Sequence, residues 1–230
     1  DTLMGELIRR EHEKSQLEYR VLLNQINPHF IYNVLNSIKV MANIQKIEGI
    51  SSMASSLGSL LKEISKGAAE QIPVRRELEL LDKYLYIQRI RRNGLLPVTY
   101  DIEDEEVLNC LIPRFTLQPL AENAISHGLD GTDRLGEIHI SIGSESSEAP
   151  EGGDVVIVMH DNGVGIPEDK IKTLFDEERI STDSIHVGLI NVDKRIKLFF
   201  GSGGLSVESR EGEYTKIYIR FPKRFLKKED

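Results

Sequence analysis

Two groups of residues, far apart in the sequence, have side chains suited to phosphoryl transfer. The first is the run 27–33 (NPHFIYN), which places His29 near the start of a helix-forming segment. The second comprises Glu122, Asn123 and the run 161–165 (DNGVG). A neutral imidazole can accept a phosphoryl group, and a separate nucleotide site could supply one. Together, the two groups predict a chain that phosphorylates its own histidine.

Glu122 and Asn123 lie in a segment, 114–127, that we predict to be helical. A side-chain amide is an acceptable ligand for Mg²⁺ when water and phosphate oxygens supply most of the octahedron. The alternative is that both side chains merely cap or solvate one face of the helix. Taken alone, this pair does not distinguish a metal site from an ordinary polar surface.

Two glycine-containing runs follow farther along the chain. After an apolar strand, Asp161 in the run 161–165 could accept a hydrogen bond from an exocyclic amine such as adenine N6. A simple turn is the competing interpretation of this run. Residues 188–195 (GLINVDKR) open a predicted helix, and its free N–H groups, with Asn191 and Arg195, could seat phosphates. A plain helix start would have the same sequence features.

The composition excludes several classes of protein. The 230 residues are 40% hydrophobic and 29% charged, as in an ordinary soluble protein with one large domain or two small ones. A net charge of −8 argues against a nucleic-acid binder, so we expect no nucleic acid among the partners. No apolar run approaches the roughly 20 residues that span a bilayer. The single cysteine, Cys110, favours a reducing compartment.

The first hundred residues have the sequence pattern of helices. Residues 3–26 carry a weak coiled-coil pattern, and apolar residues recur at helical spacing over 29–45 and 50–64. We expect a short turn near Gly49 to join the last two helices in a hairpin. Because one hairpin has little interior of its own, burial of both apolar stripes favours a homodimer with a four-helix bundle. A further helix is predicted over 76–92.

After residue 94 the pattern changes to a mixture of strands and helices. The predicted strands are 98–102, 137–142, 154–160, 205–209 and 215–221, the last two forming a hairpin, and a late helix is predicted over 188–200. Their order lacks the regular spacing of a parallel sheet, so we expect an α/β sandwich with helices on one face of a mixed sheet. The predicted fold class is therefore α+β, with domains at 1–94 and 95–230.

In their order and spacing, the downstream motifs resemble the GHKL ATP-binding fold, which is found in gyrase B, MutL and sensor histidine kinases. The segments 117–127 (LQPLAENAISH), 161–165 and 188–195 are similar to the N box and the two glycine boxes of that fold. The resemblance implies ATP and Mg²⁺ as cofactors. It also implies that Asn123 holds Mg²⁺ and that Asp161 recognises adenine through a hydrogen bond.

The same resemblance implies roles for further residues. Those expected to shape the site, or to lie near the phosphates or the adenine, are His127, Gly163, Gly165, Gly188, Asn191, Arg195 and Thr215. Residues 168–187 are expected to form a mobile lid. In ATPases of this fold, a glutamate one helical turn before the Mg²⁺ asparagine activates water. Here that position is Pro119, which can abstract no proton, so transfer to another nucleophile is favoured over hydrolysis.

The upstream run supplies the candidate nucleophile. A histidine in an amphipathic segment is usually an ordinary polar residue, and this interpretation applies to His12, His139, His160 and His186. In contrast, residues 25–38 (QINPHFIYNVLNSI), which surround His29, closely resemble the phosphoacceptor segment of LytS/YesM-type sensor histidine kinases. This resemblance extends over nearly the whole chain.

The family resemblance implies an ATP-dependent protein-histidine kinase that autophosphorylates His29 and passes the phosphoryl group to an aspartate of a response regulator. Its expected partners are a second copy of itself and a receiver domain. Commoner histidine kinases have an acid directly after the acceptor, where this chain has Phe30, so Glu122 is a candidate proton acceptor. Asn33 matches the position at which other kinases orient water for phosphatase action.

In that family, the upstream part carries membrane and sensing segments. The sequence opens at Asp1 without an initiator methionine. We therefore expect a soluble piece of an integral membrane sensor, on the cytoplasmic side of the cell membrane. Two alternative functions stay open: a GHKL-fold ATPase or protein-serine kinase, and a scaffold that binds nucleotide without transfer.

Overall fold

The computed structural model describes residues 28–65, 70–129, 135–145, 153–174 and 184–225. They belong to two compact units, which divide between Lys66 and Gly67. The helical pattern predicted over residues 3–26 lies outside the described residues.

The first unit is a hairpin of two helices, α2 (Pro28–Ile44) and α3 (Glu48–Ser65), as predicted. The turn between them comes earlier than the expected position near Gly49, which lies in the first turn of α3. Lys46 adopts a left-handed conformation at φ 57° and closes α2, while the N–H of Ile47 donates to the carbonyl of Ala42 at 2.9 Å. The chain therefore reverses without glycine at the left-handed position.

Much of the apolar surface of this hairpin is exposed in the single chain. The exposed side chains at helical spacing are Phe30, Val34, Ile38, Met41 and Ile44 on α2, with Ile50, Leu57 and Ile64 on α3. Exposed apolar side chains at this spacing are typical of a helix pair that packs against a partner.

The second unit is built on a mixed sheet in the order β2-β4-β5-β7-β6. Its strands are β2 (Val98–Ile102), β4 (Ile138–Glu145), β5 (Asp154–Asp161), β6 (Gly204–Arg210) and β7 (Tyr214–Pro222). β2 is parallel to β4, and the other neighbours are antiparallel. The five predicted strands and the mixed character of the sheet are confirmed.

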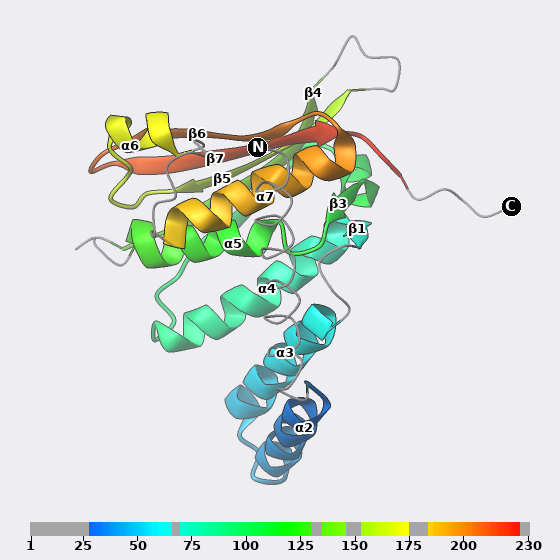
Figure 1. Cartoon of the computed structure of the whole chain (residues 1–230). Helices are drawn as coiled ribbons and strands as arrows, with labels where there is room; N and C mark the ends of the chain where they lie inside the picture. The colour runs from blue at the N-terminus through cyan, green and yellow to red at the C-terminus, as the bar shows by residue number, and fades with distance from the viewer. Residues whose placement is uncertain (1–27, 66–69, 130–134, 146–152, 175–183, 226–230) are drawn as a thin grey trace, which may run out of the picture. The chain divides into compact units, whose positions relative to one another are not determined.

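One face of this sheet forms the core of the second unit. Along β5, Val155, Ile157 and Met159 are buried, whereas the residues between them are partly exposed. Ile140 and Ile219 on the neighbouring strands are paired with Met159 and Ile157 in register and are equally buried. The helices α5 (Leu117–Asn123) and α7 (Ser184–Phe200) cover this face in Figure 1. The predicted α/β sandwich is therefore confirmed.

The remaining elements pack around α4 (Val74–Arg91) or beside the sheet. Sequence patterns did not predict the small sheet of β1 (Gln71–Pro73) with β3 (Leu111–Pro113), or the 3₁₀-helix η1 (Glu105–Asn109). A short helix, α6 (Glu168–Thr173), contacts β6. Because α4 contacts α5, η1 and both strands of the small sheet, it belongs to the second unit. The predicted division into functional domains at 94/95 stays a prediction.

Two predicted helices have different bounds. The segment 114–127 contains α5, which begins at Leu117, and the start of a π-helix, η2 (Ala124–Leu129). Phe115 has φ 59°, so no helix can run through it. The late helix, α7, begins at Ser184 rather than at Gly188. Both differences bear on the functional site.

Candidate functional site

A pocket lies where the ends of β5 and β7 meet α5, η2 and α7. Its lining residues are Asn123, Ala124, His127, Gly128, Asp161, Gly165, Ile166, Leu189, Thr215 and Ile217. The structure thus brings together five residues predicted from separate motifs: Asn123, His127, Asp161, Gly165 and Thr215. Tertiary packing adds an apolar wall, because Leu189 is fully buried and Ile217 nearly so.

Asp161 is a carboxylate held at low exposure on the pocket wall. The residue is 3% exposed, and its Oδ1 accepts the backbone N–H of Gly163 at 3.0 Å. Burial raises the pKa of Asp161 to about 6, although the Gly163 hydrogen bond opposes that shift. Thr215 is its partner across β5 and β7, and both side chains line the pocket. A hydrogen-bond donor on a ligand could therefore meet two adjacent oxygen-bearing side chains.

The glycines after Asp161 are required by close backbone contacts. A Cβ on Gly163 would lie 2.3 Å from the carbonyl oxygen of Gly128, and the N–H of Val164 donates to that same oxygen at 2.9 Å. Gly165 has φ +68°, and a Cβ there would lie 2.1 Å from the carbonyl oxygen of Arg210. The loop therefore packs tightly between η2 and the β6–β7 hairpin.

Gly128 is a pocket residue that sequence reasoning missed. A Cβ at this position would lie 2.6 Å from Oδ1 of Asp161. The sequence signal of this role was a glycine directly after His127, at the end of the N box. A side chain at this position would displace the buried carboxylate of Asp161.

Asn123 is the last residue of α5 and has the character of a ligand-binding group. Its Nδ2 is buried and has no hydrogen-bond partner among the residues that the structure describes. Such an orphaned polar atom at a pocket wall fits a polar ligand. No group of three or more His, Cys, Asp or Glu able to hold a metal occurs in the described ranges. The orphaned atom is an amide nitrogen, which can donate to a phosphate oxygen, and the atom able to ligate Mg²⁺ would be the side-chain oxygen of Asn123.

The prediction that Gly188 opens a helix and offers free N–H groups is wrong. α7 begins at Ser184, so the backbone of Gly188 lies one turn inside the helix. A Cβ on Gly188 would lie 3.6 Å from Nδ2 of Asn123, so the glycine stands beside the amide group. Asn191, predicted to lie near phosphates, is exposed on α7 and is not among the residues lining the pocket.

Arg195 makes contacts other than those expected from its motif. Its two terminal nitrogens donate to the backbone carbonyls of Arg114 and Phe115, each at 3.0 Å. Burial lowers its pKa, and the nearby charge of Glu77 opposes that shift. The structure therefore connects Arg195 to the turn that precedes α5, and its role near phosphates stays a prediction without structural support.

Glu77 is a second residue that sequence reasoning missed. This side chain on α4 is 1% exposed and accepts the N–H groups of Phe115 at 3.0 Å and Leu117 at 2.9 Å. Burial raises the pKa of Glu77, whereas these N–H groups and then Arg195 act to lower it. A charged residue on the buried face of α4 was the only sequence signal of this role.

The other predicted site residues lie on the helices without lining this pocket. His29 and Asn33 are one turn apart on α2, in the first unit. Asn33 is exposed, as is Phe30 between them. Glu122 is exposed on α5, next to Asn123. Of the predicted lid over 168–187, the structure describes α6 and the start of α7, and residues 175–183 lie outside the described ranges.

Comparison with known proteins gives two family matches that cover most of the chain. A model described as histidine kinase matches residues 17–96, which include His29. A model described as histidine kinase-, DNA gyrase B-, and HSP90-like ATPase matches residues 113–224, which include the whole pocket. The chain belongs to the histidine kinase family. The family is one of transferases that bind ATP, which agrees with the character that the motifs predicted.

Individual relatives agree with this assignment. Sensor histidine kinase YesM of Bacillus subtilis is 37% identical over 223 residues, which cover 96% of this chain and 36% of YesM. Sensor protein LytS of Streptococcus agalactiae is 26% identical over 215 residues, covering 94% of this chain and 36% of LytS. The uncharacterized protein YwpD of B. subtilis is 32% identical over 203 residues, which are 85% of this chain and 68% of YwpD.

The predicted resemblance to LytS/YesM-type kinases is thus confirmed. The chain spans about a third of the length of YesM and LytS. Among the helices that the structure describes, none is long and apolar enough to cross a membrane.

Proposed function

We propose that this chain is the kinase core of a two-component sensor, which phosphorylates His29 from ATP and passes the phosphoryl group to an aspartate of a response regulator. The observation that carries the proposal is the single pocket that gathers Asn123, Asp161 and Thr215. The same chain holds His29 in the segment matched by the histidine kinase model.

We assign different pocket residues to different parts of ATP. Asp161 and Thr215 hold the adenine, and Leu189 and Ile217 provide apolar contact for its ring. Asn123 would hold Mg²⁺, and the bound ion would offset the negative charge of the phosphates. His127 lines the same pocket, and we assign it a position beside the phosphates.

Transfer forms a bond between an imidazole nitrogen of His29 and the γ-phosphorus, and ADP leaves with the electrons of the broken P–O bond. The neutral imidazole is the nucleophile, so its ring proton must move to a base. Phe30 cannot accept this proton, and we assign that role to Glu122, whose carboxylate is exposed on α5. Pro119 leaves no carboxylate to activate water at the position that serves hydrolysis in related ATPases.

The exposed apolar stripe of α2 and α3 supports a homodimer. Burial of side chains such as Ile38 and Met41, which are 40% and 60% exposed in the single chain, would stabilise a four-helix bundle of two hairpins. We further propose that a receiver domain is the second partner. For the whole protein, we propose an integral membrane sensor with this part on the cytoplasmic side.

The test is incubation of the chain with γ-³²P-ATP and Mg²⁺, followed by acid and alkali treatment of the labelled protein. We expect a label that is labile to acid and stable to alkali, absent in His29→Gln and in Asp161→Asn. His139→Gln, on the opposite face of the sheet from the pocket, is the matched control and should keep the label. Labelling that persists in His29→Gln would contradict the proposal. An acid-stable label would favour a serine kinase, and binding without label would favour a scaffold.

We also propose that Asn33 orients water for dephosphorylation of the response regulator, because it lies one helical turn after His29. In Asn33→Ala we expect slower loss of label from the phosphorylated receiver, with autophosphorylation retained. A variant that dephosphorylates the receiver as fast as the wild type removes this assignment.

A further inference from the structure

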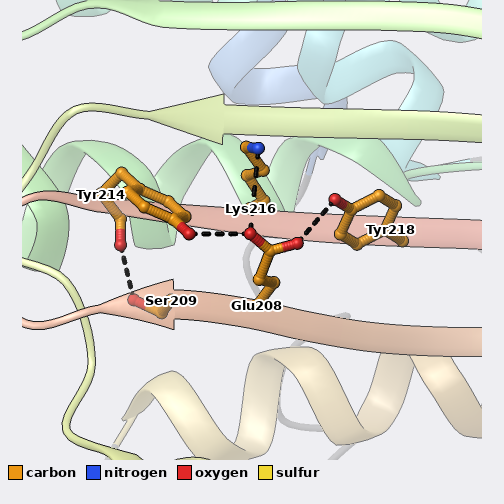
Figure 2. A network of polar contacts seen from close by, with 5 residues as sticks. All are labelled: Glu208, Ser209, Tyr214, Lys216 and Tyr218. Atoms are coloured by element: carbon orange, nitrogen blue, oxygen red, sulfur yellow. Dashed lines mark hydrogen bonds and ion pairs between the residues drawn. The ribbon is translucent and has the colours of Figure 1, made fainter.

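The hydroxyl of Ser209, at the end of β6, contacts three polar groups beside the pocket. Its Oγ accepts the backbone N–H of Ile166 at 2.8 Å and lies 3.1 Å from Oγ1 of Thr215. It donates to the backbone carbonyl of Tyr214 at 2.6 Å, as Figure 2 shows. Ile166 and Thr215 line the pocket, and Ser209 stands behind them.

The position of this hydroxyl is fixed by the β6–β7 hairpin. On the other face of the sheet, Glu208 accepts the hydroxyls of Tyr214 at 2.7 Å and Tyr218 at 3.0 Å, and Lys216 lies 3.8 Å away (Figure 2). These contacts and the backbone pairing of the two strands hold the hairpin in register, so Ser209 stays opposite Thr215.

Counting protons determines the direction of the hydrogen bond between the two hydroxyls. A hydroxyl has one proton and two lone pairs. The proton of Ser209 is used on the Tyr214 carbonyl, which can only accept, and one lone pair of Ser209 takes the N–H of Ile166. The contact with Thr215 therefore has Thr215 as the donor. Toward the pocket, the Thr215 hydroxyl can then only accept a hydrogen bond.

Asp161 adds a second acceptor beside the first. It pairs with Thr215 across β5 and β7, and its carboxylate accepts hydrogen bonds when ionised. Two acceptors side by side match a ligand edge that carries donors. The amino group of adenine presents N–H donors at its 6-position, whereas a 6-oxopurine presents an acceptor oxygen there.

We propose that Ser209 is a specificity-determining residue, which makes the pocket prefer an aminopurine by holding the Thr215 hydroxyl as an acceptor. It acts through Thr215 and Ile166 and is therefore a positioning residue. The inference rests on the proposed function, because it takes ATP to be the nucleotide that this pocket binds.

The test compares the affinities of ATP and inosine triphosphate, which differ at the 6-position and N1 of the purine. Calorimetry is done with the full chain carrying His29→Gln, so that no phosphoryl transfer occurs. In Ser209→Ala the Thr215 proton is released and can be donated to the 6-oxo group. We expect weaker ATP binding and a fall of about five- to tenfold in the preference for ATP over inosine triphosphate.

Two further variants separate this role from simple packing. Ser209→Thr keeps the hydroxyl and should restore the wild-type preference. Ser206→Ala makes the same change as Ser209→Ala at an exposed position on the same strand and should leave the preference unchanged. If Ser209→Ala does not fold, Ser209→Cys keeps the size of the side chain while weakening the hydrogen bonds, and the same fall in preference is expected.

The outcomes are distinct. The specificity role is overturned if Ser209→Ala lowers the affinities for ATP and inosine triphosphate equally, or changes neither. In that case Asp161→Asn should still lose ATP binding, which leaves the proposed function standing. Failure of the wild-type pocket to bind ATP overturns the proposed function, and this inference with it.

Discussion

The carboxylate of Glu77 on α4 accepts the backbone N–H of Leu117, the first residue of α5, at 2.9 Å. The same carboxylate accepts the N–H of Phe115, while Arg195 on α7 holds the carbonyls of Arg114 and Phe115. Three helices therefore meet at one short turn with a left-handed residue in it. Because α5 ends at Asn123, this turn positions the residue proposed to hold Mg²⁺.

We predict that Glu77→Ala lowers the free energy of unfolding by about 2–4 kcal/mol, because two buried N–H groups lose their acceptor. Chemical denaturation measures the change. Glu79→Ala, on the same helix but about half exposed, is the matched control and should stay within about 0.5 kcal/mol of the wild type. Equal effects of the two substitutions would show that the Glu77 contacts do not stabilise the turn.

Glu77 and Arg195 should be energetically coupled. Glu77 binds N–H groups of the turn and Arg195 binds its carbonyls. Once one substitution has loosened the turn, the second should therefore lower the free energy of unfolding by less. In a double-mutant cycle with Glu77→Ala and Arg195→Met, we expect a coupling energy of about 1 kcal/mol or more. Additive losses in the free energy of unfolding would mean that the two side chains act independently.

Asp161→Asn should stabilise the fold while weakening ATP binding by about tenfold or more. Burial raises the folded-state pKa of Asp161 from its ordinary value of 3.8 to about 6, so the folded protein binds this proton more tightly. Stability from Asp161 is therefore present at low pH and lost as pH rises from about 4 to about 6. The asparagine variant should gain roughly 1–3 kcal/mol over the wild type above pH 6 and nothing near pH 4. Thermal unfolding across this range measures the difference, and a constant difference would contradict the assignment.

Gly165→Ala should lower the free energy of unfolding much more than Gly212→Ala. Both glycines have positive φ, +68° and +80°, so both substitutions carry a backbone cost of about 1 kcal/mol. At Gly212 an added Cβ meets nothing within 4 Å, whereas at Gly165 it would lie 2.1 Å from a backbone oxygen. We expect Gly165→Ala to lose several-fold more unfolding free energy and to reduce ATP affinity, measured by denaturation and calorimetry. Similar losses of unfolding free energy in both variants would mean that backbone strain alone explains the effect and that the close contact at Gly165 adds nothing.

Ile38→Asp should convert the proposed homodimer to a monomer, because a charge would replace an apolar side chain in the stripe of α2. Asn43→Asp, at an exposed position of the same helix that is out of helical phase with the stripe, is the control and should leave the dimer intact. Sedimentation equilibrium of the full chain measures both. A wild-type chain that sediments as a monomer at micromolar concentration would argue against the dimer.

Local pattern was enough for most of the fold. Apolar residues at helical spacing predicted α2 and α3, alternation predicted β2, and runs rich in strand-forming residues predicted β4 and β5, because these signals depend on near neighbours in sequence. The short elements were missed, since β1 and β3 form only by pairing with each other. The early start of α7 was also missed because its first residues lack a clear apolar period.

For the pocket, the sequence by itself determined which groups are available: the amide of Asn123, the carboxylate of Asp161 and the glycines that allow close contact. Tertiary structure decided what each group does. Among the described residues, it left Nδ2 of Asn123 without a hydrogen-bond partner, paired Arg195 with backbone carbonyls, and brought Ser209 beside Thr215. The physical reason is that a buried polar group must find its partner among segments brought together by packing, and no local pattern records that choice.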